Sequence, residues 1–259
     1  MAKTALDVAH AAMQAGKETD RLRFYDRLAD AELYVLLCAE PQGDRITPQT
    51  FDVDDGTFIL AFDREERLTQ FVGQAAPYAA LSGRLVTEML AGQGIGLGLN
   101  LDVAPSSILI PASAVDWLHE ALANRPTQID TQPLEISAPG DLSEALLTAL
   151  DAKLATAAGY ARMAYLVSVI YAPARPGHLL VFIDAIPATE GALSQAVGEA
   201  LTFSGLDAGE IDVGFVDAAD PFAAKLARVG LRFDLPTPEP VRTPPGAPGM
   251  DPTTPPKLR

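Results

Sequence analysis

The chain has 259 residues, which is enough for one large domain or two small ones. Apolar residues make up 48% of it and charged residues 20%, a composition that excludes a wholly disordered protein. Nineteen basic residues against 34 acidic ones give a net charge of −15, and a surface with this charge repels phosphate backbones and anionic lipid. We therefore expect neither nucleic acid nor a membrane as a partner.

The chain contains one cysteine, Cys38, so an intramolecular disulfide and a cysteine-rich zinc site are excluded. Because Cys38 ends a strongly apolar stretch, we expect a buried and inert thiol. The sequence starts without an apolar leader, and its longest uncharged stretches, such as residues 89–101, are too short to cross a bilayer. These features indicate a cytoplasmic protein.

The first half of the chain predicts a mixture of helices and strands. Amphipathic periodicity and capping residues, such as Thr4 with Asp7 and Ser82 before Gly83, mark the helices. The expected helices span residues 4–15, 21–29, 64–71, 83–91 and 111–123. The expected strands span residues 32–38, 51–53, 57–62, 95–101 and 107–110. Residues 32–38 are apolar on both alternating faces, which predicts a central strand covered on both sides.

The second half predicts strands at residues 134–137, 164–171, 178–184 and 211–216, with helices at 141–154 and 190–203. This β-α-β-β-α-β order fits a ferredoxin-like unit, which is a split βαβ arrangement. A further helix is expected from Asp220 to Gly230, followed by a short strand at 231–233. The expected fold class is α+β, with two α/β-type domains, the second of which fits a ferredoxin-like βαββαβ unit plus a helix.

Breaker residues at 124–127 separate the two halves. We predict an N-terminal domain over residues 1–125, a C-terminal domain over residues 126–235 and a disordered, proline-rich tail over residues 236–259. Nine of the 24 residues from 236 to 259 are proline, a composition that cannot form a packed core. A docking tail for a proline-reading domain is the alternative interpretation of this segment.

The most unusual local feature is a glycine-rich segment at residues 92–100. It lacks the lysine of a phosphate-binding loop and the spacing of a dinucleotide fingerprint, so nucleotide binding is not expected. A period of two leaves one strand face bare at Gly94, Gly96 and Gly98, opposite the apolar residues Ile95, Leu97, Leu99 and Leu101. A bare face indicates the close approach of another element. We favour a helix of the same domain over a groove for a partner or ligand.

The sequence carries no motif that defines a catalytic or metal site. Residues 52–56 lack the spacing of a calcium-binding EF-hand loop and fit a hairpin turn better. His119 lies one helical turn after Asp116, which is as typical of a surface pair as of a catalytic dyad. Nucleophile elbows and HExxH zinc motifs are missing. We expect a protein that is not an enzyme and that uses no metal and no cofactor.

Several stretches resemble a known family. Residues 24–35, 76–84, 92–100 and 107–111 are similar to the N-terminal domain of SseB-like proteins, the bacterial enhanced serine sensitivity family. Residues 197–206 and 211–215 resemble the C-terminal domain of the same family. The resemblance implies a cytoplasmic bacterial protein of unknown molecular activity, linked to serine, other amino-acid or sulfur metabolism through contacts rather than chemistry. It implies no catalytic residues.

The leading hypothesis is a non-enzymatic interaction or regulatory protein with an unidentified protein partner. A module that binds an amino acid or a related metabolite is the first alternative, and an unrecognised enzyme is the second. Arg84 is a polar candidate because its guanidinium can take a carboxylate through two hydrogen bonds. The candidate binding or interaction residues are Arg84, Gln93, Gly94, Gly96, Gly98 and Asn100.

Overall fold

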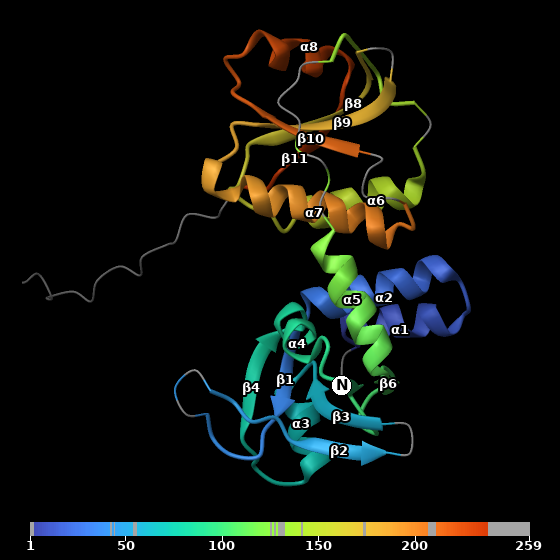
Figure 1. The fold of residues 1–259 in the computed structure, drawn as a ribbon, viewed down its shortest axis with the longest axis vertical. Coiled ribbons are helices and arrows are strands. Elements are labelled where there is room, and N and C mark those ends of the chain that lie inside the picture. The colour runs from blue at the N-terminus through green and yellow to red at the C-terminus, as the bar shows by residue number, and fades with distance from the viewer. Residues whose placement is uncertain are drawn as a thin grey trace, which may run out of the picture.

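A computed structural model of the chain describes residues 3–237, apart from 42, 44, 54–55, 125, 127, 129–132, 141, 173–174 and 207–210. The described residues form two sheets, one in each half of the chain, and helices pack on both faces of each sheet (Figure 1). The α+β class with two α/β-type domains is thereby confirmed. The predicted proline-rich tail lies outside the described residues, apart from residues 236 and 237.

The helices of the N-terminal half are α1 (Ala5–Gln14), α2 (Glu18–Asp30), α3 (Glu65–Val72), α4 (Gly83–Leu90) and α5 (Ala112–Ala123). Thr4 caps α1 as predicted, because its hydroxyl accepts the backbone N–H of Asp7 while the Asp7 carboxylate accepts the backbone N–H of Thr4. Ser82 caps α4, also as predicted. Helix α2 starts earlier than predicted and has no side-chain cap at Lys17.

The strands of this half are β1 (Glu32–Leu36), β2 (Thr50–Val53), β3 (Gly56–Phe62), β4 (Tyr78–Ser82), β5 (Ile95–Leu99) and β6 (Ile108–Ile110). They form a sheet in the order β4-β1-β3-β5-β6, with β2 paired to β3. Leu33 and Val35 of β1 pack on the face covered by α1, α2, α4 and α5, and Leu36 packs on the α3 face. The predicted central strand covered on both sides is confirmed, whereas β4 was not predicted.

The C-terminal half contains helices α6 (Glu144–Leu154), α7 (Glu190–Phe203) and α8 (Pro221–Val229). Its strands are β7 (Glu135–Ser137), β8 (Met163–Tyr171), β9 (Arg175–Ile183), β10 (Ile211–Val216) and β11 (Leu231–Asp234). The sheet order is β10-β9-β8-β11, and β7 also pairs with β8. Helices α6 and α7 pack on one face of this sheet and α8 packs on the other.

The element order of the second half matches the prediction, but the strand pairing differs from a split βαβ unit. A split unit places another strand between the two parallel strands that a helix connects. Here β9 and β10, which α7 connects, are direct parallel neighbours, and β7 pairs antiparallel with β8. The ferredoxin-like detail is therefore corrected: β9-α7-β10 is a simple βαβ crossover attached to the β8-β9 hairpin.

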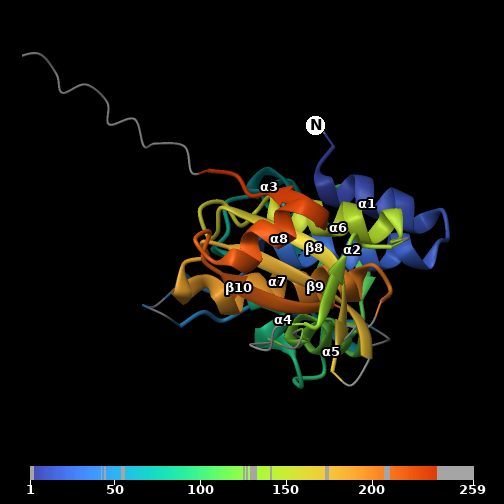
Figure 2. The ribbon, with the colours of Figure 1, turned by 90° about the horizontal axis from the view of Figure 1, so that it is seen from above.

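The two halves meet through their helices. Helix α7 contacts α2 and α5, and the sheet of the C-terminal half lies beyond α6 and α7 as seen from the N-terminal half (Figure 1). Seen from above, one half lies over the other (Figure 2). Phe203 of α7 packs into the hydrophobic core of the N-terminal half, with its ring centre 6.4 Å from that of Trp117 in α5. In the part of the chain that the structure describes, no helix is long and apolar enough to cross a membrane.

Candidate functional site

Charged side chains from both halves gather where the helices meet. We call this group the interdomain cluster, and its members are Asp26, Asp30, Arg84, Lys153 and Glu199. Asp26 and Asp30 lie one turn apart on α2 and so share a helix face. Arg84 belongs to α4, whereas Lys153 and Glu199 come from α6 and α7 of the other half. The cluster therefore links the two halves electrostatically.

Lys153 lies at the centre of the interdomain cluster. Its side chain is 6% exposed, and Nζ lies 2.6 Å from Asp26 Oδ1, 2.7 Å from Asp30 Oδ2 and 3.1 Å from Glu199 Oε2. Burial alone lowers the pKa of Lys153, but the three carboxylates outweigh burial and raise that pKa above its usual value. The ammonium group therefore stays charged although water is nearly excluded.

Arg84 closes the interdomain cluster on the other side. Its guanidinium donates to both carboxylate oxygens of Glu199, with Nη2 2.6 Å from Oε2, and Nη2 also lies 2.5 Å from Asp30 Oδ1. The Glu199 side chain is only 2% exposed. The carboxylate that we expected Arg84 to take from a ligand is thus provided by the protein itself, in the bidentate geometry that arginine favours.

The interdomain cluster has three carboxylates against two cations, so it carries one excess negative charge. Burial raises the pKa of Asp26, and Lys153 offsets only part of this effect. Burial also acts on Asp30, but Lys153 and then Arg84 outweigh it and lower the pKa of that carboxyl group. Asp26 is therefore the carboxylate of the pair on α2 that most readily takes up a proton.

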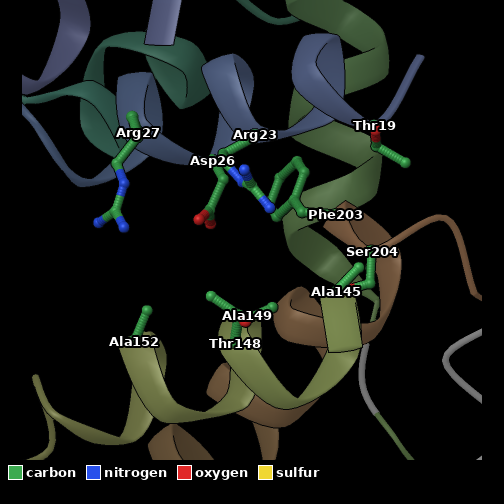
Figure 3. A pocket seen from close by; sticks show the side chains of 10 residues that line it. All are labelled: Thr19, Arg23, Asp26, Arg27, Ala145, Thr148, Ala149, Ala152, Phe203 and Ser204. Atoms are coloured by element: carbon green, nitrogen blue, oxygen red, sulfur yellow. The ribbon is translucent and has the colours of Figure 1, made fainter. Parts of the chain in front are cut away.

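Two hollows lie between the two halves of the chain, beside the interdomain cluster. The larger has a volume of about 270 Å³, and Arg84, Lys153 and Tyr160 are among the residues that line it. The smaller, of about 40 Å³, lies between α2 and α6 (Figure 3). There Asp26 and Arg27 point from α2 toward the small side chains of α6. A space of this size holds a few water molecules, so of these two hollows the larger is the one with room for a metabolite.

The predicted glycine face is buried and filled by the sheet itself at Gly96 and Gly98, whereas Gly94 is exposed. A Cβ atom added to Gly96 would lie 2.5 Å from Phe58 Cε1 and 2.6 Å from the carbonyl oxygen of Ile110. A Cβ atom added to Gly98 would lie 2.6 Å from Leu60 Cδ2. Phe58 and Leu60 belong to the adjacent strand β3. The face is therefore occupied, and a neighbouring strand fills it instead of the expected helix.

We expect Gly96→Val to lower the stability of the N-terminal domain by about 1–3 kcal/mol or more, because overpacking a filled site displaces its neighbours. The matched control is Leu97→Ile at the next position of β5, which keeps volume and apolarity and should cost less than about 1.5 kcal/mol. Urea denaturation of both variants measures the difference. A Gly96→Val variant as stable as the wild type would show that Phe58 moves aside freely.

The six predicted site residues do not form one site. Arg84 belongs to the interdomain cluster, and Gln93 and Gly94 lie in the exposed turn between α4 and β5. Gly96, Gly98 and Asn100 are buried in the N-terminal half. The list of predicted residues is Arg84, Gln93, Gly94, Gly96, Gly98 and Asn100. Sequence spacing placed them near one another along the chain, but folding separates them.

Asn100 belongs to a buried polar network that the sequence did not predict. Its φ of 51° is left-handed, its side-chain Nδ2 donates to Ser106 Oγ, and its side-chain Oδ1 accepts the Asp63 backbone N–H. Ser106 donates to Asp7, and Arg67 donates to Asp7 and Asp63. These contacts tie α1, α3, the end of β3 and the loop after β5 together. The network is fully internal, so its role is structural.

The residues that the sequence analysis weighed as catalytic or reactive groups do not form a catalytic arrangement. His119 is exposed, and Asp116 accepts the backbone N–H of Gly92 at 2.8 Å. Cys38 is exposed, which corrects the expected buried thiol, and it lies two residues beyond the end of β1 at Leu36. Within the described ranges, no three acidic, histidine or cysteine side chains are arranged to hold a metal ion.

An open sheet edge is the clearest surface feature of the N-terminal half. Strand β4 is the last strand on its side of the sheet, and its inner edge pairs with β1 over all five residues. Leu37 N–H donates to Pro77 O and Gly83 N–H donates to Ala31 O, which fixes the hydrogen-bonding phase of the pair. In that phase, the peptide groups of Ala79 and Leu81 point to β1. Those of Tyr78, Ala80 and Ser82 point outward.

No other described segment pairs with the outer edge of β4, which runs along the side of the N-terminal half (Figure 1). Its sequence, Tyr-Ala-Ala-Leu-Ser, contains no charged residue and no proline. Sheet edges are usually blocked by charges, prolines, bulges or covering elements. Ala80, at the centre of β4, is exposed and small, so another backbone can approach closely. This edge therefore has the geometry of a strand acceptor.

The comparisons with known proteins agree with the resemblance of the N-terminal half to SseB-like proteins. The family model of the SseB protein N-terminal domain matches residues 5–117, a range that includes β1 to β6 and the first half of α5. No curated protein and no solved structure matches the chain. The resemblance of residues 197–215 to the C-terminal domain lies beyond the matched range. The match of residues 5–117 to the SseB protein N-terminal domain supports the assignment of the chain to the SseB-like family.

Proposed function

We propose that the chain is a non-enzymatic interaction protein that binds an extended segment of a partner along the outer edge of β4. The observation that carries this proposal is the outward-facing peptide groups of Tyr78 and Ala80 on an edge strand without charge or proline. Strand addition of this kind takes its affinity from main-chain hydrogen bonds and its specificity from alternate side chains. Any link to amino-acid or sulfur metabolism then depends on the partner rather than on chemistry in this chain.

The elements around β4 hold this strand in place, as a strand that accepts a partner segment requires. Strand β1 pairs with all of β4, and its side chains are packed against helices on both faces of the sheet. Gly83, directly after β4, has no room for a side chain, because a Cβ atom there would lie 1.8 Å from the carbonyl oxygen of Leu28 in α2. The end of β4 is thus held against α2, and a partner strand would meet a rigid edge.

The decisive variant is Ala80→Pro. Proline removes an N–H that points away from β1, and edge strands tolerate proline at such positions. We expect the variant to fold normally and to lose the partner that the wild type retains from an extract of the source organism. The retained protein is identified, purified and tested by co-elution from a sizing column. Ala80→Ser, which keeps the N–H, is the matched control and should bind as the wild type does.

Ala79→Pro tests the assigned phase of the strand. The Ala79 N–H faces β1, so its removal should break a hydrogen bond in the sheet and lower stability. In thermal melts we therefore expect Ala79→Pro to lower the melting temperature and Ala80→Pro to leave it near that of the wild type. Equal destabilisation by both, or a partner that Ala80→Pro retains undiminished, would contradict strand addition at β4.

Metabolite binding is the second candidate function. The 270 Å³ hollow places Arg84 and Lys153 beside one another, which favours an amino acid or another small carboxylate. A ligand there has to compete with Glu199 for the Arg84 guanidinium. The test is a thermal-shift screen against free amino acids, because a ligand that binds only the folded state raises the melting temperature. No shift with any amino acid would remove this candidate.

A further inference from the structure

We infer that the segment received by β4 carries basic side chains at alternate positions, an inference that rests on the proposed strand addition. The side chains beside the open edge determine this chemistry. On the α3 face of the sheet, Tyr34 of β1 and Tyr78 of β4 pack edge to face with ring centres 5.4 Å apart. An acidic residue lies beside each of these two rings.

Glu32 and Glu65 are the two acidic residues. The Tyr34 hydroxyl donates to Glu32 Oε2 at 3.1 Å, and this hydrogen bond raises the pKa of Tyr34. Burial and then the carboxylate of Glu65 raise the pKa of Tyr78. Both glutamates are exposed, and neither takes part in an ion pair within the described part of the chain. The two carboxylates are therefore available to a cationic partner.

The positions of the carboxylates match the two ends of β4. Glu32 lies opposite Ser82 in the β1–β4 register, and Glu65, at the start of α3, lies beside Tyr78. Side chains of an added strand that point to this face recur every second residue. A lysine or arginine near each end of the added strand can thus reach a carboxylate, and its cation can lie against a tyrosine ring.

The opposite face of the edge favours apolar side chains. Ala79 and Leu81 point to this face and pack against the hydrophobic core, and Leu85 at the start of α4 is 42% exposed. The intervening residues of the added strand would lie over these three apolar side chains. Alternating basic and apolar residues are therefore the pattern that fits both faces of β4.

A second copy of this chain does not fit the edge. Antiparallel pairing of two β4 strands about Ala80 would set Tyr78 of one copy opposite Ser82 of the other. Glu65 of each copy would then lie near Glu32 of the other, so like charges would meet at both ends of the pairing. The chain also carries a net charge of −15. The occupant is therefore a different protein with a basic segment.

The test uses the full chain and two fluorescent five-residue peptides, one alternating lysine with valine and the other alternating glutamate with valine. We expect the lysine peptide to bind, with an affinity that falls as salt is added, and the glutamate peptide not to bind. The double variant Glu32→Gln/Glu65→Gln should weaken lysine-peptide binding about 2- to 30-fold, the range for the loss of two exposed ion pairs. Glutamine keeps a hydrogen-bond acceptor for Tyr34.

The matched control, Glu120→Gln/Glu135→Gln, removes the same charge from exposed positions on α5 and β7. It should bind the lysine peptide as the wild type does. If both peptides bind equally and Ala80→Pro abolishes both, strand addition stands and the basic pattern is wrong. If Ala80→Pro binds the lysine peptide normally, strand addition itself is wrong. The inference of a basic partner is also wrong if the wild type does not bind the lysine peptide. It is likewise wrong if the wild type forms a dimer that Ala80→Pro dissociates and the glutamine variants do not.

Discussion

Replacing Arg67 with methionine should destabilise the protein by about 3–5 kcal/mol, the cost of removing one partner from a buried ion pair. Arg67 Nη2 lies 2.5 Å from Asp7 Oδ2 and Nη1 lies 2.7 Å from Asp63 Oδ1, and the three side chains are between 1% and 5% exposed. Methionine fills similar space but leaves two buried carboxylates without a cation. Urea denaturation measures the loss.

The matched control is Arg21→Met on α2. Arg21 also pairs with a carboxylate, Glu18, at 2.6 Å, but the two side chains are 52% and 69% exposed. Surface pairs of this kind contribute about 0–1 kcal/mol, so the control should lose little stability. If Arg67→Met loses no more than Arg21→Met, the buried network does not hold α1 against α3.

Asp7→Asn should change how stability depends on pH. Burial opposes ionisation of Asp7, but hydrogen bonds from Arg67 and then from Ser106 and Thr4 outweigh burial and hold its pKa well below the usual 3.8. A carboxyl group with a lowered folded-state pKa contributes stability above its unfolded pKa and loses it as the pH falls. We expect the variant to be less stable at pH 7 and to lose less further stability between about pH 5 and pH 2. Parallel pH curves for the variant and the wild type would contradict this role.

Local signals in the sequence predicted local structure well. Thr4 with Asp7, Ser82 and the Asp220-Pro221 pair identified helix starts, because a cap depends on residues within one turn. The apolar run in β1 predicted a strand covered on both sides for a similar reason, because the apolarity of each residue indicates that this residue is buried. The paired strands β8 and β9 and helix α7 follow from the same kind of signal.

Strand β4 was missed because its residues have no strand signal of their own. Ala79 and Ala80 favour helices, and only five residues separate Pro77 from Gly83. The strand forms because all five residues pair with β1. Its open edge, on which the proposed function depends, is therefore a property of the tertiary fold that no local sequence pattern predicts.

The buried ionic contacts were missed for a related reason. Asp7 and Arg67 are 60 residues apart, and Arg84 and Glu199 are 115 residues apart. Each looks like an ordinary surface residue in its own segment. Arg84 was predicted as a residue that binds a ligand or partner, and its pairing with Glu199 of α7 becomes evident only in the folded chain. Long-range pairing is what a single sequence cannot supply.

Lys153→Met should have the second-largest effect, again about 3–5 kcal/mol, because three carboxylates of the interdomain cluster lose their shared cation. The single tryptophan, Trp117, provides the readout at the domain interface, since its ring centre lies 6.4 Å from that of Phe203 in α7. We expect its fluorescence to change at a lower urea concentration than in the wild type. Lys225→Met, at an exposed position of α8, is the matched control and should be near neutral.

The loss caused by Lys153→Met should also depend on pH, but through a carboxyl group whose pKa is raised rather than lowered. Burial already raises the pKa of Asp26, and removing Lys153 withdraws the charge that offsets burial. A carboxyl group with a raised folded-state pKa binds protons more tightly in the folded state, so stability falls as the pH rises through that range. The gap between variant and wild type should therefore be smallest in mild acid and widen toward neutral pH. Adding Asp26→Asn to Lys153→Met should narrow the gap at neutral pH, because it removes one uncompensated charge. A double variant no more stable than Lys153→Met would mean that these two side chains do not share one electrostatic site.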